Sequence, residues 1–143
     1  MVAELDRFGR VLVVCAHPDD ESFGLGGVLA ALVDQGASVR ALCFTRGEAS
    51  TLGSGTGDLA ALRAGEVTEA AGVLGLESVE LLDYPDGGLE GVPVEELAAH
   101  VRRLGAGVDA LVAFDALGVT GQRDHVAATR VAVHAAAELG VPV

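Results

Sequence analysis

Short apolar runs rich in β-branched residues alternate along this chain with longer segments whose apolar residues recur at helical spacing. Continuous apolar runs are typical of strands buried on both faces. Strands are expected at Val11–Cys15, Ser38–Phe44, Val79–Leu82 and Ala110–Phe114, with a fifth beginning at Val141–Val143. Helices are expected at Ser22–Gln35, Leu59–Leu74, Val94–Leu104 and His125–Leu139. This alternation predicts an α/β fold: a doubly wound, Rossmann-like parallel sheet with helices on both faces.

Length and charge narrow the class of protein further. The 143 residues show no linker and no repeat, so one domain over residues 1–143 is expected. The net charge of −12 makes binding to nucleic acid or to an anionic membrane surface improbable on electrostatic grounds. The longest apolar stretch, Ser22–Val33, is shorter than the about 20 residues that span a bilayer. Without a convincing secretory signal, and with two cysteines in apolar runs, the chain is expected to be cytoplasmic, with both thiols reduced.

The strongest chemical signal follows the first predicted strand, in the segment His17–Glu21. His17 and Asp20 lie three residues apart across a proline-containing turn, so both side chains can converge beyond the sheet edge. Imidazole nitrogen and carboxylate oxygen suit Zn²⁺, and catalytic zinc sites hold three protein ligands and one water. Asp19 is then well placed as a general base for that water. Helix capping is the alternative, but it requires neither three carboxylates nor the preceding His and Pro.

A third zinc ligand is expected from His125, which follows the fourth predicted strand. If the strand order is 3-2-1-4-5, the loops after strands 1 and 4 face one crevice at the switch point. His17, Asp20 and His125 could then meet, although more than a hundred positions separate them. In the alternative interpretation, Asp124 caps the last helix and His125 faces solvent.

Five motifs run in order along the chain: His17–Glu21, Thr45–Glu48, Arg63–Glu66, Tyr84–Gly87 and Gly121–His125. Together they resemble the LmbE-like, or PIG-L, N-acetylglucosaminyl deacetylases. The resemblance covers nearly the whole chain but only the N-terminal catalytic core of that family, so the family's C-terminal part is expected to be missing. It implies one Zn²⁺ per chain on His17, Asp20 and His125, with Asp19 as the proton carrier. The implied substrate is a small N-acetylated amino sugar or a related conjugate, which would release acetate.

The resemblance also implies residues that hold the substrate. Arg63 and Asp86 match substrate-binding positions, and Glu48 lies in a loop that shapes the pocket. Two local alternatives stay open, because Arg63 could pair with acidic residues along its own helix and Asp86 could be a turn residue.

One position departs from the family pattern. Gln122 stands where the family commonly has a histidine directed at the developing oxyanion. A glutamine amide can donate a hydrogen bond there but cannot carry a positive charge, which predicts a slower enzyme. The alternative function is a catalytically weakened relative that keeps the metal and acts as a binding module. A metal-dependent phosphoesterase is less favoured, because the sequence offers convincing ligands for one metal only. Association into a homo-oligomer, shielding the unfinished fifth strand, is an open possibility.

Overall fold

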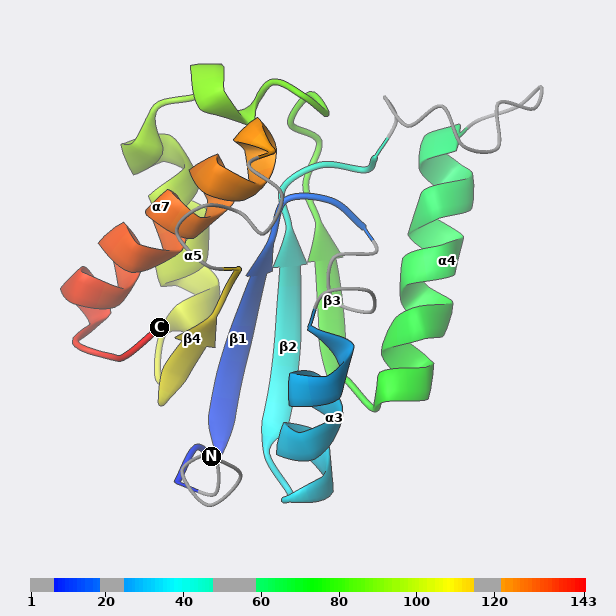
Figure 1. Ribbon diagram of the computed structural model, residues 1–143, viewed down its shortest axis with the longest axis vertical. Helices are drawn as coiled ribbons and strands as arrows, with labels where there is room; N and C mark the ends of the chain where they lie inside the picture. Colours follow the sequence, from blue (N-terminus) through cyan, green and yellow to red (C-terminus); the bar gives the residue numbers. More distant parts are fainter. Residues whose placement is uncertain (1–6, 19–24, 48–58, 115–121) are drawn as a thin grey trace.

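Four parallel strands form a single sheet in the order β3-β2-β1-β4 (Figure 1). This computed structural model describes residues 7–18, 25–47, 59–114 and 122–143, without the side chains of residues 59–64 and 67. The strands are β1 (Arg10–Cys15), β2 (Ser38–Cys43), β3 (Ser78–Leu81) and β4 (Ala110–Val112). In the sheet, Val13 of β1 pairs with Ala41 of β2 on one side and with Val112 of β4 on the other. The parallel α/β architecture predicted from the sequence is confirmed.

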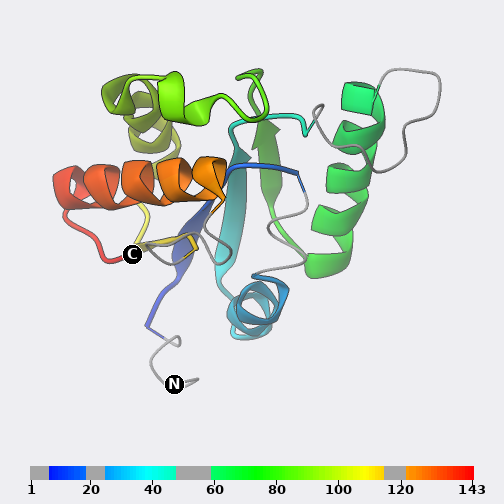
Figure 2. The same ribbon diagram turned by 45° about the horizontal axis from the view of Figure 1, so that its top comes forward.

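Helices cover both faces of this sheet, as Figures 1 and 2 show. The helical elements are α3 (Gly26–Asp34), α4 (Leu59–Leu74), the single 3₁₀ turn η1 (Leu89–Gly91), α5 (Val94–Gly105) and α7 (Arg123–Leu139). Helices α3 and α4 pack on one face, and α5 and α7 lie side by side on the other. No helix within these described ranges is long and apolar enough to cross a membrane.

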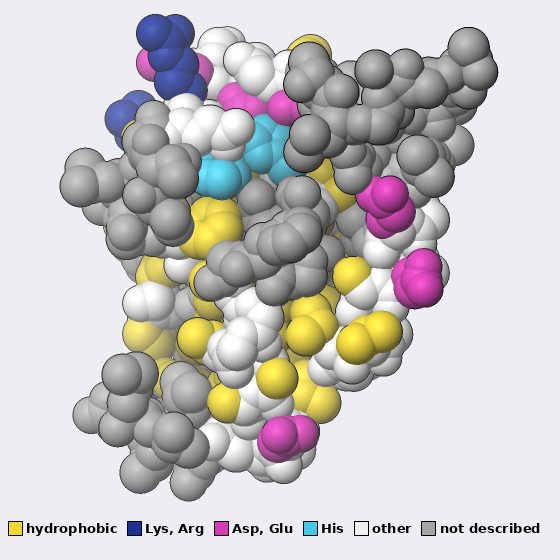
Figure 3. Space-filling view, turned by 45° about the vertical axis from the view of Figure 1, so that its right-hand side comes forward, with side chains coloured by type: hydrophobic (Ala, Val, Ile, Leu, Met, Phe, Trp, Pro, Cys, Tyr) yellow, Lys and Arg dark blue, Asp and Glu magenta, His cyan; other side chains and the backbone are white. Residues whose placement is uncertain are grey.

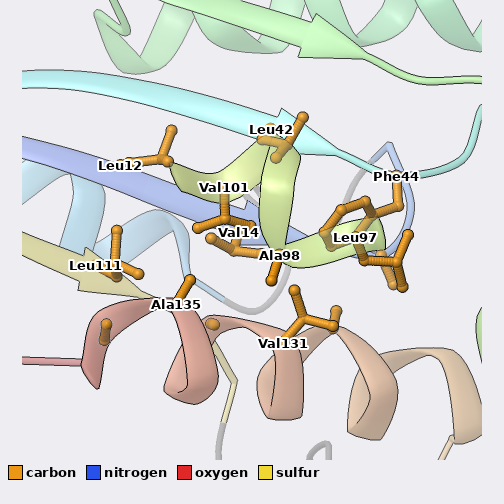
Figure 4. Packing of buried hydrophobic residues seen from close by; sticks show 14 of the residues in the cluster. Leu12, Val14, Leu42, Phe44, Leu97, Ala98, Val101, Leu111, Val131 and Ala135 are labelled. Atoms are coloured by element: carbon orange, nitrogen blue, oxygen red, sulfur yellow. The ribbon is translucent and has the colours of Figure 1, made fainter. Parts of the chain in front are cut away.

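Strand β1 lies at the centre of two apolar clusters. Leu12 and Val14 pack with residues of α5 and α7, and Figure 4 shows Val14 beside Val101 and Ala98 of α5. Val11, Val13 and Cys15 point to the opposite face, toward α3. Because successive side chains of a strand alternate between faces, a strand covered on both sides must be apolar throughout. Val11–Cys15 is an unbroken apolar run because both faces of the strand are buried.

One predicted strand is absent from the structure, and one predicted helix is described only in part. Residues 141–143 form no strand, although the Leu111 amide of β4 donates a hydrogen bond to the Pro142 carbonyl at 2.9 Å. Pro142 has no N–H with which to extend a ladder. The helix predicted from Ser22 is present from Gly26, with Leu25 as its N-cap at φ −117°. Its predicted residues 22–24 lie outside the described part of the chain.

Both cysteines are buried and neither forms a disulfide, as predicted. The predicted loop Ala49–Gly57 lies outside the described residues. The predicted turn segment Pro85–Pro93 contains a tight turn, in which the Gly88 amide donates to the Pro85 carbonyl at 2.9 Å, followed by η1. Sequence reasoning did not predict η1, which connects this turn to α5.

Candidate active site

The carboxyl ends of β1, β3 and β4 bring four polar side chains to one edge of the sheet. His17 follows β1 by two residues, and Asp86 lies in the turn after β3. Asp124 and His125 occupy the first turn of α7, the next described helix after β4. Since β1 and β4 are neighbours in the sheet, residues 17 and 125 meet across 108 positions of sequence. Histidine and acidic side chains are visible together in the upper part of Figure 3.

His17 is the centre of this cluster. Its Nε2 lies 2.9 Å from Asp124 Oδ2 and 2.9 Å from Asp86 Oδ1. An ionised carboxylate only accepts hydrogen bonds, so a hydrogen bond from His17 to either carboxylate requires the tautomer with the N–H at Nε2. The other ring nitrogen, Nδ1, lies 3.3 Å from His125 Nε2. The two carboxylates therefore orient the imidazole so that Nδ1 faces His125.

Asp124 supports the site and does not cap its helix. Its side chain is only 2% exposed and accepts hydrogen bonds from the Gly87 amide at 2.7 Å and the Leu89 amide at 3.1 Å. Gln122 is the N-cap residue of α7, and its side chain forms no capping bond. The interpretation of Asp124 as a helix cap is therefore wrong. Its carboxylate instead ties η1 and the preceding turn to His17.

A glycine is required in that turn. Gly87 has φ +84°, a left-handed conformation that side chains with a Cβ rarely adopt. In this conformation its amide donates to Asp124. Asp86, directly before it, is partly buried and contacts His17.

His125 is half-buried and does not point into solvent, so that alternative is also wrong. Its ring packs against Phe114, with 4.8 Å between the centroids, and lies 5.2 Å from the ring of His17. These contacts hold its Nε2 toward His17 Nδ1. The described part of the chain thus brings together two of the three predicted zinc ligands.

The spacing of these nitrogens fits one tetrahedral ion. Two nitrogens at 2.0–2.1 Å from the same zinc are about 3.4 Å apart, close to the 3.3 Å between His17 Nδ1 and His125 Nε2. His17, Asp86 and Asp124 also form a compact group whose ligand atoms lie within 4.8 Å of one another. The 2.9 Å contacts of His17 Nε2 in that group are hydrogen-bond lengths. A ligating histidine commonly donates its second ring N–H to a carboxylate, which matches this division of roles.

The structure describes the remaining predicted site residues only in part. Gln122 is exposed, directly before the first turn of α7. Arg63 lies in α4, and its side chain is not among those described. Asp19, Asp20 and Glu48 lie outside the described residues.

Sequence reasoning missed a second polar cluster next to the site. The Tyr84 hydroxyl donates to Glu96 Oε1 at 2.9 Å and lies 3.0 Å from His100 Nε2, both on α5. Burial, together with the hydrogen bond to the negative Glu96, raises the pKa of Tyr84 to about 12. This contact ties the segment that carries Asp86 to α5. The only available signal was the spacing of Glu96 and His100, which places them on one helix face.

Comparison with known proteins decides the family. The family described as "PIG-L: GlcNAc-PI de-N-acetylase" matches residues 12–136. The chain belongs to the PIG-L family. The resemblance seen in its motifs is thereby confirmed, and the match includes His17, Asp86 and His125.

Relatives of this PIG-L chain include a 1D-myo-inositol 2-acetamido-2-deoxy-alpha-D-glucopyranoside deacetylase from Mycolicibacterium vanbaalenii. The two are 32% identical over 90% of this chain and 54% of the relative. This chain spans about half the length of the curated relatives it matches.

Solved structures share the fold. The N,N'-diacetylchitobiose deacetylase from Pyrococcus horikoshii matches 93% of this chain and 51% of its own, with a TM-score of 0.81 and 28% identity. A 4-carboxy-2-hydroxymuconate hydratase from Pseudomonas putida KT2440 matches 88% of this chain and 55% of its own, with a TM-score of 0.66 and 27% identity. The same architecture therefore carries deacetylation in one relative and hydration in another.

Proposed function

We propose that this chain is the catalytic core of a zinc-dependent hydrolase that removes the N-acetyl group from an N-acetylglucosamine derivative. The observation that supports this most strongly is the 3.3 Å separation of His17 Nδ1 and His125 Nε2, with His17 Nε2 held by two carboxylates. A pair of imidazole nitrogens so arranged suits a metal better than a purely structural role. Deacetylase relatives that share the family and the fold support the same reaction.

In this proposal His17, Asp20 and His125 hold the ion. Bound there, Zn²⁺ would supply Lewis-acid activation of the amide carbonyl and of a water molecule. Asp124 and Asp86 would keep His17 in the tautomer that presents Nδ1 to the ion.

The proposal assigns both proton transfers to Asp19. Its carboxylate would take a proton from the attacking water and later deliver a proton to the amine nitrogen as the C–N bond breaks. Acetate and the free amino sugar would be the products. Gln122 would donate a hydrogen bond from its side-chain amide to the carbonyl oxygen as negative charge develops. Its exposed position at the N-cap of α7 leaves the side chain without a capping bond.

Sugar binding is assigned to Arg63, Asp86 and Glu48. Asp86 would hold a sugar hydroxyl from the same carboxylate that contacts His17, which would couple substrate binding to the orientation of that ligand. The binding partner of the chain is then a small molecule, the N-acetylated sugar. The buried, disulfide-free cysteines favour a cytoplasmic location for the protein. Association between copies of the chain is a separate question.

The direct test combines metal content with acetate release. Zinc-loaded protein is expected to retain about one Zn²⁺ per chain and to release acetate from N-acetylglucosaminyl inositol or N,N'-diacetylchitobiose. His125→Ala should lose the metal and the activity, whereas His134→Ala, an exposed histidine of the same helix, should retain both. Wild-type protein that retains no zinc would overturn the proposal.

A metal-retaining binding module is the second candidate, favoured by the neutral Gln122 at the place of a family histidine. Zinc bound at one per chain with no acetate released from either substrate would support it. Its ligand would then be sought by direct binding of the same acetylated sugars to the zinc-loaded protein.

A further inference from the structure

An apolar groove lies between η1, α5 and α7, behind the first turn of α7. It has a volume of about 120 Å³. Apolar side chains from all three elements line it, among them Leu89, Val92, Val94, Leu97, Val126 and Val131. The groove therefore offers apolar walls to a short alkyl chain.

The mouth of the groove carries more positive than negative charge, in a chain whose net charge is −12. Arg123 and Arg130 line it from α7, and Glu90 lines it from η1. Arg123 reaches Glu90 at 3.6 Å, an exposed pair that contributes little in water. Arg130 is exposed and forms no ion pair within the part of the chain that the structure describes. A negative group at the mouth would gain a guanidinium partner there.

The groove and the candidate active site share a wall. Leu89 lines the groove, and its amide donates to Asp124 Oδ1 at 3.1 Å. Asp124 in turn contacts His17. Arg123 stands directly before Asp124 in the first turn of α7. A molecule that occupies both places would pass over the N-terminal turn of this helix.

We infer that the groove binds a short apolar chain that ends in an acidic group, a carboxylate or a phosphate. The chain fills the space between η1, α5 and α7, and the acidic group pairs with Arg130 and Arg123. This inference rests on the proposed function. The chain and its acidic group belong to the substrate, and they are joined to the amino sugar whose acetyl group lies at His17 and His125.

Binding is tested first without any metal or turnover. Straight-chain carboxylates from acetate to heptanoate are titrated into the zinc-free protein, with the methyl NMR signals of its valines and leucines as the readout. Affinity is expected to rise about fourfold for each added methylene until the chain fills the groove, and then to level off. Pentanamide should bind more weakly than pentanoate or pentyl phosphate. Equal affinities for acetate and pentanoate, with no binding of pentyl phosphate, would overturn the inference.

Four variants locate the binding. Arg130→Gln should lower the affinity for pentanoate two- to fivefold. Glu90→Gln should raise that affinity by a similar factor, because a competing negative charge is removed. Arg7→Gln makes the same charge change in the segment before β1 and should have no effect. Val126→Phe should block the groove while the circular dichroism spectrum stays that of the folded protein. If Arg130→Gln and Arg7→Gln behave alike, the arginines at the groove mouth are not the anion's partners and the assignment is wrong.

The link to the substrate has its own readout. Zinc-loaded protein is compared on N-acetylglucosamine and on its glycoside with 5-hydroxypentanoate. The acidic glycoside should have the lower KM, and Arg130→Gln should remove that difference with little change in kcat. Pentanoate binding without a KM difference would overturn the substrate role alone. Absence of turnover on both sugars would count against the proposed function, while the titrations on zinc-free protein would still decide the groove.

Discussion

Asp124 holds His17 from the far side of its ring: Asp124 Oδ2 lies 2.9 Å from Nε2, while Nδ1 faces His125. The same carboxylate accepts two backbone amides of the segment from Gly87 to Leu89. One buried acid therefore links the strand-end histidine, the turn after β3 and the start of α7. This link fixes the orientation of the His17 ring relative to His125.

Asp124→Asn should weaken zinc binding about ten- to a hundredfold, because an amide is a poorer acceptor for the His17 N–H and cannot accept at both ends. Competition with a chromogenic chelator measures the affinity. Asp109→Asn is the matched control, since Asp109 also accepts two amides, from Gly9 and Arg10, but at the opposite sheet edge. Equal zinc affinities for the two variants would refute the orienting role of Asp124.

Gln122→His should raise kcat for acetate release about 10- to 100-fold, because an imidazolium stabilises a developing oxyanion better than a neutral amide. Zinc content should stay the same, since Gln122 is not among the proposed ligands. Gln122→Ala should lower kcat below that of the native chain by removing the donor. A kcat unaffected by either substitution would show that Gln122 lies away from the reacting carbonyl.

Tyr84 should titrate with a midpoint near pH 12, well above its ordinary range. It is the one tyrosine of a chain without tryptophan, so ultraviolet absorbance of the phenolate reports on it alone. Its raised pKa stabilises the folded state fully below the unfolded value of about 10, and this contribution is lost as the pH rises from 10 to 12. Glu96→Gln should lower the midpoint, because a negative neighbour is removed. The same midpoint in native and urea-unfolded protein would contradict this account.

Leu42→Ala should reduce the free energy of unfolding by about 3 kcal/mol, because Leu42 is completely buried between β2 and the α5–α7 layer. Val73→Ala, at a side chain that is 85% exposed on α4, should change it by less than about 0.5 kcal/mol. Urea unfolding followed by circular dichroism measures both. A comparable loss in the two variants would mean that the cluster around Leu42 is not the stabilising core.

The local spacing of apolar residues determined the helices and strands. Leu59–Leu74 was predicted with the bounds that α4 has, since helical spacing of apolar residues and a following glycine are properties of neighbouring positions. The parallel sheet followed from strand–helix alternation, which leaves few topologies. The family was also readable, because its motifs are contiguous stretches that keep their order along the chain.

The roles within the site required the tertiary structure. From the sequence alone, His17 and His125 are candidate ligands, Asp124 has no role except as a helix cap in the alternative interpretation, and Asp86 is a substrate contact or a turn residue. Both carboxylates contact His17 only because β1 lies between β2 and β4, with the turn after β3 and the start of α7 at the same edge. The contact between His17 and Asp124 joins positions 107 apart. Both contacts depend on strand order and packing, which no local pattern of side chains encodes.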